Sequence, residues 1–127
     1  MKKYNIFLII ILVTLLFAGC KYDFILPEEV PVINPDVPVS FATQIAPIFS
    51  NGDKCTSCHK TGGQTPDLSS ANAYSQTVPA FVVLTSPETS MIYSFPAPTS
   101  TTHTWKKYTS SEAALILEWI KQGAKNN

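Results

Sequence analysis

Charge is scarce in this sequence, and the two signs balance. Nine basic and nine acidic residues in a chain of 127 give 14% charged residues and a formal net charge of zero. The basic runs are no longer than the pairs Lys2-Lys3 and Lys106-Lys107. Proteins that bind nucleic acids carry a basic patch or stripe that neutralises phosphates. The sequence therefore indicates no nucleic-acid partner.

Groups for acid–base catalysis are also few. The chain has two histidines, and the carboxylates Asp67, Glu88, Glu112 and Glu118 fit roles as loop, cap or solvent-facing residues. No set of residues suited to general acid–base chemistry is evident. The length, with no internal repeat, allows one small domain and a targeting segment. We expect a protein that is not an enzyme in its own right.

The first twenty residues indicate export. Lysines at positions 2 and 3 precede an apolar stretch over 6–18, which is shorter than the run of about 20 residues usual for a membrane-spanning helix. The sequence Leu-Phe-Ala-Gly-Cys at 16–20 resembles a bacterial lipoprotein cleavage box, although Phe17 is larger than the usual residue there. That resemblance implies a signal peptide over 1–19 and a lipid on the sulfur of Cys20. The alternative is an uncleaved membrane anchor in which Cys20 is incidental.

Either alternative attaches the protein to a membrane. A diacyl chain would hold it stably, at about 0.8 kcal/mol per buried methylene. The interpretation as a lipoprotein predicts an exported protein of a Gram-negative bacterium, in the periplasm or associated with the outer membrane. Residues 20–39 then form a tether containing Pro27, Pro31, Pro35 and Pro38. Proline fixes φ and favours an extended backbone, although the alternating valines also allow an edge strand.

Helical signals dominate the remaining segment, 40–127. Ser40 is a candidate cap for a helix that carries apolar residues at helical spacing and contains Pro47, which predicts a kink or an early stop. A turn is expected at 51–53, a loop at 60–66, a short helix around 71–76, a helical turn at 87–93 and a loop at 94–108. Thr109 and Glu112 form a capping box for a last helix that ends near Gly123. We expect a small all-α domain, which would be marginally stable without a further core.

The run Cys-Thr-Ser-Cys-His at 55–59 is the most specific motif. A Cys-x-x-Cys-His motif is typical of c-type haem attachment. One tight turn presents the thiols of Cys55 and Cys58 to the two vinyl groups of a haem, and His59 to its iron as the proximal ligand. The alternatives are a zinc site, a redox-active thiol pair or a structural disulfide. Zinc needs further ligands, of which only His103 remains, and a thioredoxin-like βαβ pattern is absent.

The second axial position of the iron has two ordinary candidates after the tether, His103 and Met91. Met91 lies in a stretch with helical spacing, where methionine is commonly a core residue. His103 lies in a Ser/Thr-rich loop that can cross the haem face, so we favour His103 as the distal ligand; a vacant or water-filled position is the third alternative. Two imidazole ligands would give a lower potential than an imidazole and a thioether. On the proximal side, a carbonyl from 63–66 is close enough in sequence to accept from the other nitrogen of His59.

The chain also resembles a known family over nearly all of 40–127. The resemblance rests on the haem motif and, in the same order as the family, on Phe41…Ile45-Ala46-Pro47-Ile48-Phe49, Pro66-Asp67-Leu68, Ser90-Met91-Ile92-Tyr93 and Trp119-Ile120-Lys121-Gln122-Gly123-Ala124. It is to class I-like monohaem c-type cytochromes, particularly small haem-binding lipoproteins of Bacteroidetes type. The family implies first and last helices that cross beside the haem. Many relatives carry Met-Pro before the last helix, where this chain has His103-Thr104-Trp105.

These observations predict one-electron transfer by a membrane-tethered cytochrome with one covalent haem c and with redox protein partners that the sequence does not identify. Two alternatives stay open. One is a haem-based sensor or gas-binding module, which needs an open or weakly held distal position. The other is an accessory subunit of a surface complex, in which the haem is mainly structural.

Overall fold

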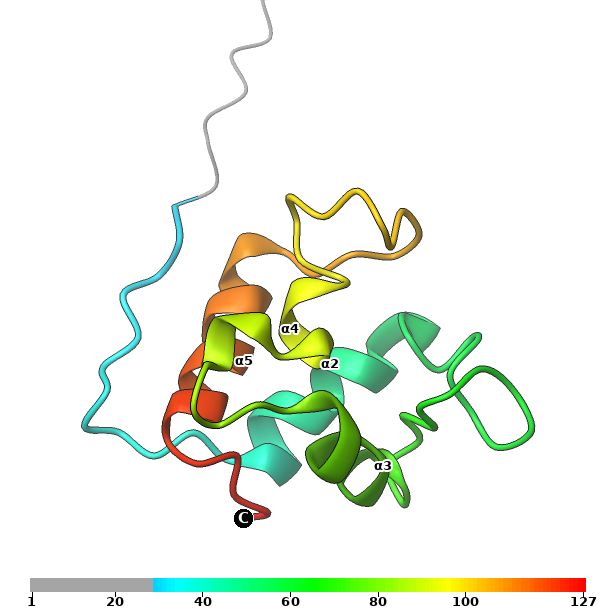
Figure 1. Ribbon diagram of the computed structural model, residues 1–127, viewed down its shortest axis with the longest axis horizontal. Helices are drawn as coiled ribbons and strands as arrows, with labels where there is room; N and C mark the ends of the chain where they lie inside the picture. Colours follow the sequence, from blue (N-terminus) through cyan, green and yellow to red (C-terminus); the bar gives the residue numbers. More distant parts are fainter. Residues whose placement is uncertain (1–28) are drawn as a thin grey trace, which may run out of the picture.

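The structure is a computed structural model that describes residues 29–127. Over this part of the chain it is helical and contains no strand, which confirms the all-α class (Figure 1). The elements in chain order are the π-helical turn η1 (Phe41–Ile45), α2 (Ala46–Ser50), the 3₁₀ turn η2 (Asn51–Asp53), α3 (Ala73–Phe81), the 3₁₀ turn η3 (Pro87–Thr89), α4 (Met91–Ser94) and α5 (Ser110–Lys121). The signal peptide expected at 1–19 and the lipid site expected at Cys20 lie outside the described residues.

Helix α5 has both of the end signals that the sequence predicts. The hydroxyl of Thr109 accepts a hydrogen bond from the backbone N–H of Glu112 at 3.2 Å, and the Glu112 carboxylate accepts from the N–H of Thr109 at 2.7 Å. After the helix, Gly123 has a φ of 96°, and the N–H of Ala124 donates to the carbonyl of Trp119 at 2.9 Å. This left-handed residue with its backward bond is a Schellman ending. The capping box and the stop at Gly123 are confirmed.

The first helix begins as predicted but changes geometry along its length. The Ser40 hydroxyl accepts from the N–H of Thr43 at 3.3 Å. In η1 the N–H of Ala46 donates to the carbonyl of Phe41, five residues back, and an ordinary α-helix follows. Pro47 lies in the first turn of α2, where its missing N–H leaves no helical bond unmade. The helix therefore continues past the proline, with a π-helical turn before it.

Helix α3 differs from the expectation. The sequence predicted a short helix around 71–76, whereas α3 begins at Ala73 and continues through Pro79 to Phe81. A proline inside a helix costs about 3 kcal/mol, so its cost must be offset by packing. Ala73 and Thr77, one turn apart, have no exposed surface, and Phe81 packs against the core. Tertiary burial therefore sets the length of this helix, and local propensity does not.

The helical turn expected at 87–93 is interrupted at Ser90, which separates η3 from α4. Ser90 is fully buried and has an extended ψ of 124°. Its hydroxyl accepts a hydrogen bond from the N–H of Val83 at 2.9 Å. The break in the helix thus satisfies a backbone donor in the loop that follows α3.

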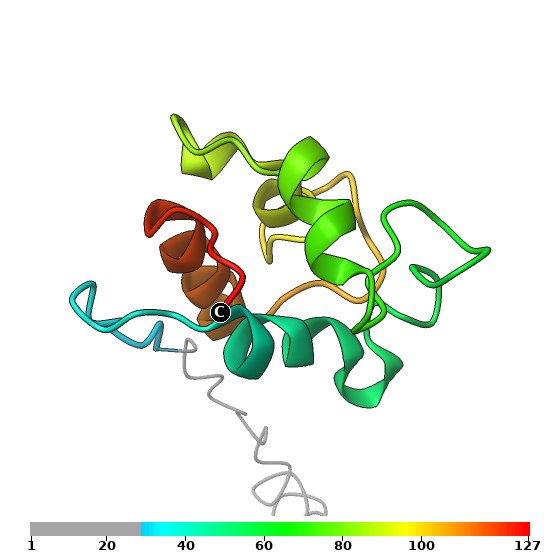
Figure 2. The same ribbon diagram turned by 90° about the horizontal axis from the view of Figure 1, so that it is seen from below.

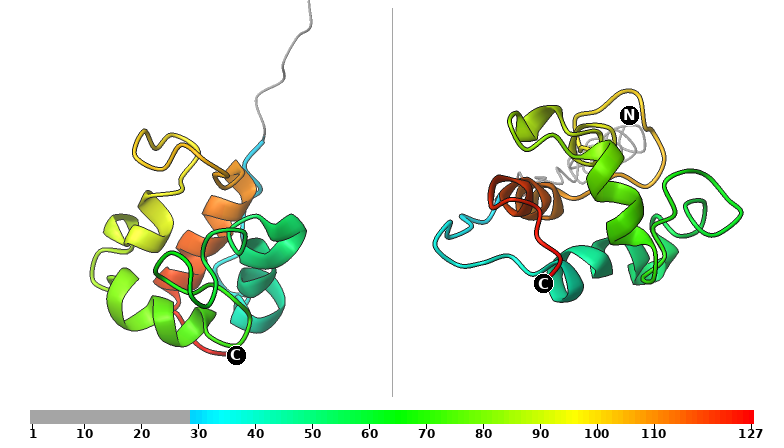
Figure 3. Two further views of the ribbon diagram at one scale, coloured as in Figure 1. Left: turned by 90° about the vertical axis from the view of Figure 1, so that its right-hand side faces the viewer. Right: turned by 60° about the horizontal axis from the view of Figure 1, so that its bottom comes forward.

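Helix α5 is the centre of the fold. It contacts η1 on one side and both η3 and α4 on another, as the left view of Figure 3 shows. The ring of the fully buried Trp119 has its centroid 5.3 Å from that of the Phe41 ring. Tyr74 of α3 packs edge-on against Phe41, with 5.1 Å between the ring centroids. Figure 2 shows the C-terminal residues lying beside the start of η1. The first and last helical segments are thus packed against each other.

The last residues of the expected tether contact the helical domain. The side-chain oxygen of Gln122 accepts from the N–H of Val39 at 2.8 Å, and its nitrogen donates to the carbonyls of Pro35 and Val37, both at 3.1 Å. Val39 is only 4% exposed. The irregular segment 29–39 forms no strand, so the edge-strand alternative is not adopted there. No helix among residues 29–127 is both long enough and apolar enough to cross a membrane.

Candidate functional site

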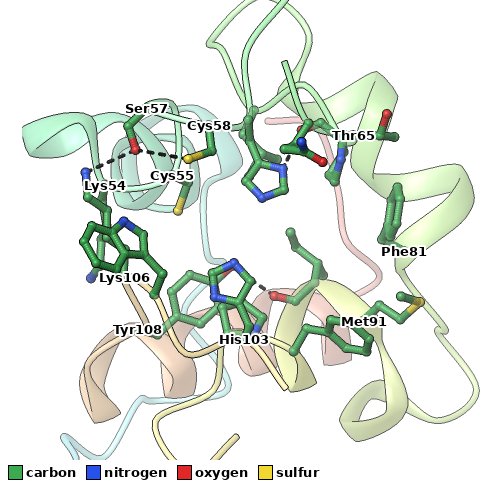
Figure 4. Close-up of a pocket in the computed structure, with 18 residues that line it drawn as sticks. Lys54, Cys55, Ser57, Cys58, Thr65, Phe81, Met91, His103, Lys106 and Tyr108 are labelled. Atoms are coloured by element: carbon green, nitrogen blue, oxygen red, sulfur yellow. Dashed lines mark hydrogen bonds between the residues drawn. The ribbon is translucent and has the colours of Figure 1, made fainter. Parts of the chain in front are cut away.

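A cavity of about 490 Å³ lies between the Cys-x-x-Cys-His segment and the loop that joins α4 to α5 (Figure 4). This volume falls within the range of about 300–1,000 Å³ that is usual for small-molecule and cofactor sites. Its lining includes Cys55, Cys58 and His59 on one side, and Met91 and His103 on the other. The structure therefore brings to one cavity every candidate site residue that lies in the described part of the chain.

The motif is presented by a sharp turn. Gly52 and Asp53 have φ values of 61° and 50°, in the left-handed region that reverses the chain. The N–H groups of Cys58 and His59 then both donate to the carbonyl of Cys55, at 3.1 and 2.8 Å. This single helical turn places both sulfurs and the imidazole close together, as attachment to one macrocycle requires. The turn predicted at 51–53 is confirmed.

Both thiols are unpaired. Cys55 is half-buried and Cys58 is exposed, and neither forms a disulfide. Burial raises the pKa of the Cys55 thiol to about 11, against the opposing effect of the nearby Lys54 ammonium. Redox-active cysteines instead have lowered pKa values, because the thiolate is the nucleophile. Among residues 29–127, no three or more His, Cys, Asp or Glu side chains cluster in a way that could hold a metal ion by themselves.

His59 is held in one orientation. Its Nδ1 lies 3.1 Å from the carbonyl oxygen of Pro66. A carbonyl can only accept, so Nδ1 carries a hydrogen, and in the neutral imidazole Nε2 is then the nitrogen with the lone pair. Iron-bound histidines are oriented in this way by a hydrogen bond from the other ring nitrogen. The predicted carbonyl partner from 63–66 is therefore present, and it is Pro66.

Asp67 stabilises the loop that carries this carbonyl. Its carboxylate accepts from the Ser69 hydroxyl and the Thr61 hydroxyl, both at 2.6 Å, from the Ser69 N–H at 2.9 Å and from the Asn72 amide at 2.8 Å. Hydrogen bonds to the charged form, led by those from Ser69 and Thr61, hold the pKa of Asp67 well below its usual value. The two ends of the loop after the motif are thus tied together next to Pro66.

This carboxylate gives a testable pH dependence. Its folded-state pKa is depressed, so its contribution to stability is complete above about pH 4 and is lost as the pH falls below that value. We expect Asp67→Asn to lower the free energy of unfolding at pH 7 and to flatten its decline between pH 4 and 2. Urea denaturation at several pH values measures both. Asp36→Asn, at an exposed carboxylate, is the control. An unchanged acid decline in Asp67→Asn would contradict this role.

His103 lies across the cavity from the motif. Figure 4 shows its ring directed into the cavity, and its centroid is 6.3 Å from that of the His59 ring, with 29° between the planes. An imidazole nitrogen lies about 1 Å from its ring centroid and about 2 Å from a bound first-row metal, so two imidazoles on opposite sides of one ion have centroids about 6 Å apart. The observed spacing fits a single metal ion between the rings.

The two histidines differ in the hydrogen bonding of Nδ1. Nδ1 of His103 is buried and has no hydrogen-bond partner among the described residues, whereas Nδ1 of His59 has Pro66. Buried polar atoms normally have a partner, and a metal-bound imidazole normally donates from its second nitrogen. Unlike His59, His103 therefore has no hydrogen bond at Nδ1 to orient its ring within the described part of the chain.

Met91, the other candidate, lies at the start of α4 and is 43% exposed. Figure 4 shows the Met91 sulfur at the edge of the cavity, on the side away from Cys55 and Cys58. His103 lies between Met91 and these two cysteines in the same view. The geometry therefore favours His103 over Met91 as the group that faces His59.

The cavity also contains residues that sequence reasoning missed. Tyr108 is 3% exposed, lines the cavity and donates from its hydroxyl to the carbonyl of Ile92 at 3.0 Å. Burial raises the pKa of this phenol well above its usual value, so it stays a neutral donor. Lys106 lines the cavity too and reaches across to the motif. No local pattern marks either residue, because each acts through contacts that are distant in sequence.

Comparisons with known proteins found no matching family model, no matching curated protein and no matching solved structure.

Proposed function

We propose that this protein is a one-electron carrier with one covalent haem c, attached at Cys55 and Cys58 and bound axially by His59 and His103. The observation that carries the proposal is the facing pair of imidazoles, 6.3 Å apart, beside the two unpaired thiols. A structural zinc needs a tetrahedral set of four ligands, whereas no three or more His, Cys, Asp or Glu side chains of residues 29–127 cluster closely enough to hold a metal ion. A disulfide or a dithiol redox site needs no second histidine across the cavity. The fold that we propose is the one implied by the family resemblance, a class I-like cytochrome domain.

Each residue has a defined task in this proposal. Cys55 and Cys58 would hold the haem by addition of each S–H across a vinyl group, with sulfur bonding to one carbon and hydrogen to the other and no oxidant consumed. The bond from Nδ1 of His59 to the Pro66 carbonyl selects the neutral tautomer in which Nε2 is free to bind a metal. A bound haem would supply a one-electron centre whose iron takes an electron from a donor and passes it to an acceptor. The walls around that centre are largely apolar.

The exposed rim of the cavity supports transfer to protein partners. Three large apolar side chains that line the cavity are well exposed: Met91, Phe95 and Trp105, the last at 69%. One side of the cavity is therefore open, and a redox group held there would lie within reach of a docked protein. We propose in addition that the protein is exported and carries a lipid on Cys20. This lipid would keep encounters with redox partners at the membrane surface.

A second candidate function is favoured by one observation, the unpartnered Nδ1 of His103. An imidazole that lacks this hydrogen bond is a weaker ligand and is more easily displaced, as a gas-binding sensor requires. The carrier and the sensor differ in the fraction of molecules with an open distal position, which sets the apparent affinity for an added ligand.

The test is made on full-length protein extracted from membranes. A pyridine haemochrome spectrum should show one covalent haem c per chain, and a redox titration should fit a single one-electron step. Carbon monoxide should bind the reduced protein slowly, as expected of a site with two axial ligands. Absence of covalent haem would overturn the whole proposal. Fast and tight carbon monoxide binding would overturn the carrier in favour of the sensor.

A further inference from the structure

The position of His103 depends on the loop between α4 and α5, since its Nδ1 has no hydrogen-bond partner among residues 29–127. Several bonds hold this loop to itself or to α4. The N–H of Tyr108 donates to the carbonyl of Pro96 at 2.9 Å, and the Lys107 ammonium donates to the carbonyls of Pro98 and Ser100. These bonds shape the loop, but they do not set its distance from the Cys-x-x-Cys-His segment on the opposite side of the cavity.

Lys106 makes the bonds that span this distance. Its ammonium donates to the carbonyl of Asp53 at 2.8 Å and to the hydroxyl of Ser57 at 3.1 Å, the second drawn as a dashed line in Figure 4. Asp53 and Ser57 lie on either side of Cys55, and Lys106 lies three residues after His103 along the chain. A single side chain thus connects the loop of the distal imidazole to the turn that presents the thiols.

The backbone at Lys106 is consistent with a fixed position. Its φ is 51°, in the left-handed region that non-glycine residues rarely adopt. Such conformations persist where the surrounding contacts determine them. Asp53, which accepts the bond from Lys106, has a φ of 50°. The residue that donates these bonds, Lys106, and one that accepts them, Asp53, thus both have left-handed backbone conformations, which contacts must maintain.

We propose that Lys106 is a positioning residue that holds His103 over His59, and so sets how often the distal position opens. The proposal rests on the proposed haem function. The ammonium acts through the loop and touches neither imidazole. With its two bonds in place, the loop keeps the 6.3 Å spacing of the rings. Without them, no described hydrogen bond joins residues 95–108 to the motif segment, and the remaining link across this side is the ion pair between Lys54 and Glu112 at the start of α5.

The test compares the haem-loaded full chain with Lys106→Met, which keeps the length and apolar stem of the side chain but removes its donors. We expect carbon monoxide to bind the reduced variant with about tenfold higher apparent affinity, since a more populated open state raises affinity in proportion. Amide hydrogen exchange over 98–105 should be about tenfold faster. Lys106→Arg, which retains donors, should restore both values toward those of the wild type.

Lys60→Met is the matched control, because it removes the same charge from an exposed position next to the motif. Unchanged carbon monoxide affinity and exchange in Lys106→Met would overturn the positioning role, as would equal changes in Lys60→Met. The proposed axial pair is tested separately by His103→Ala. If that variant binds carbon monoxide as the wild type does, the distal assignment fails, and the Lys106 proposal fails with it. If His103→Ala changes the affinity and Lys106→Met does not, only the Lys106 proposal fails.

Discussion

Replacement of both Cys55 and Cys58 by alanine is expected to reduce covalent haem from one per chain to none. The two thiols are unpaired and lie in one turn with His59, and no other cysteine occurs between residues 29 and 127. The variant retains His59 and His103 but loses every thioether. Intact-mass measurement under denaturing conditions, after expression with export, checks the result directly, because a non-covalent haem is lost and a covalent one is retained.

Cys20→Ser is the control for this experiment. It removes the sulfur to which we expect the lipid to be attached and leaves the haem motif untouched. Haem should remain at one per chain while membrane association falls. Covalent haem in the double alanine variant would show attachment through some other residue. The double variant should also unfold at a lower temperature, because a ligand that binds only the folded state stabilises it.

Replacement of His103 by alanine is expected to raise the apparent affinity of the reduced protein for carbon monoxide by about 10- to 1,000-fold. The range follows from an open state populated at about 0.1–10% when a distal ligand competes, since the variant has no such competitor. The His59 side of the site should be unaffected, because Pro66 and not His103 orients that ring. Flash-photolysis or stopped-flow measurements of carbon monoxide binding give the affinity.

Met91→Leu is the matched control, since it removes the sulfur and keeps an apolar side chain of similar volume at the rim. It should leave carbon monoxide binding and the visible spectrum unchanged. His103→Met would replace an imidazole by a thioether and should raise the reduction potential. A thioether–iron charge-transfer band in the near infrared that persists in His103→Ala would overturn the assignment of His103 and favour Met91.

The local features of the fold were predictable because they depend on neighbours along the chain. The capping box of Thr109 and Glu112, the stop at Gly123 and the turn before Cys55 each involve residues within a few positions of one another. The carbonyl from Pro66 also follows His59 closely in sequence. Hydrogen bonds and φ preferences over such short distances are nearly independent of the rest of the molecule.

The extent of α3 and the place where the tether ends were not predictable in this way. Helix α3 passes through Pro79 because its buried face, including Thr77, is covered by the rest of the domain. The carbonyls of Pro35 and Val37 are bound by Gln122, at the far end of the sequence. In α3, burial against the domain offsets the free-energy cost of a proline inside the helix. In the tether, hydrogen bonds to Gln122 restrict a backbone that is otherwise free, and these bonds form only when the chain is folded.

The candidate site likewise has one part that depends on neighbours in sequence and one part that depends on tertiary contacts. The sequence by itself determined that Cys55, Cys58 and His59 lie together, because they fall within five residues and one turn suffices to bring them together. It also narrowed the distal choice to His103 and Met91, since few residues of suitable chemistry exist. Only the tertiary structure decided that His103 faces His59 and that Lys106 spans the cavity between their segments. The position of a loop depends on long-range packing and hydrogen bonds, and no pattern of neighbouring residues encodes it.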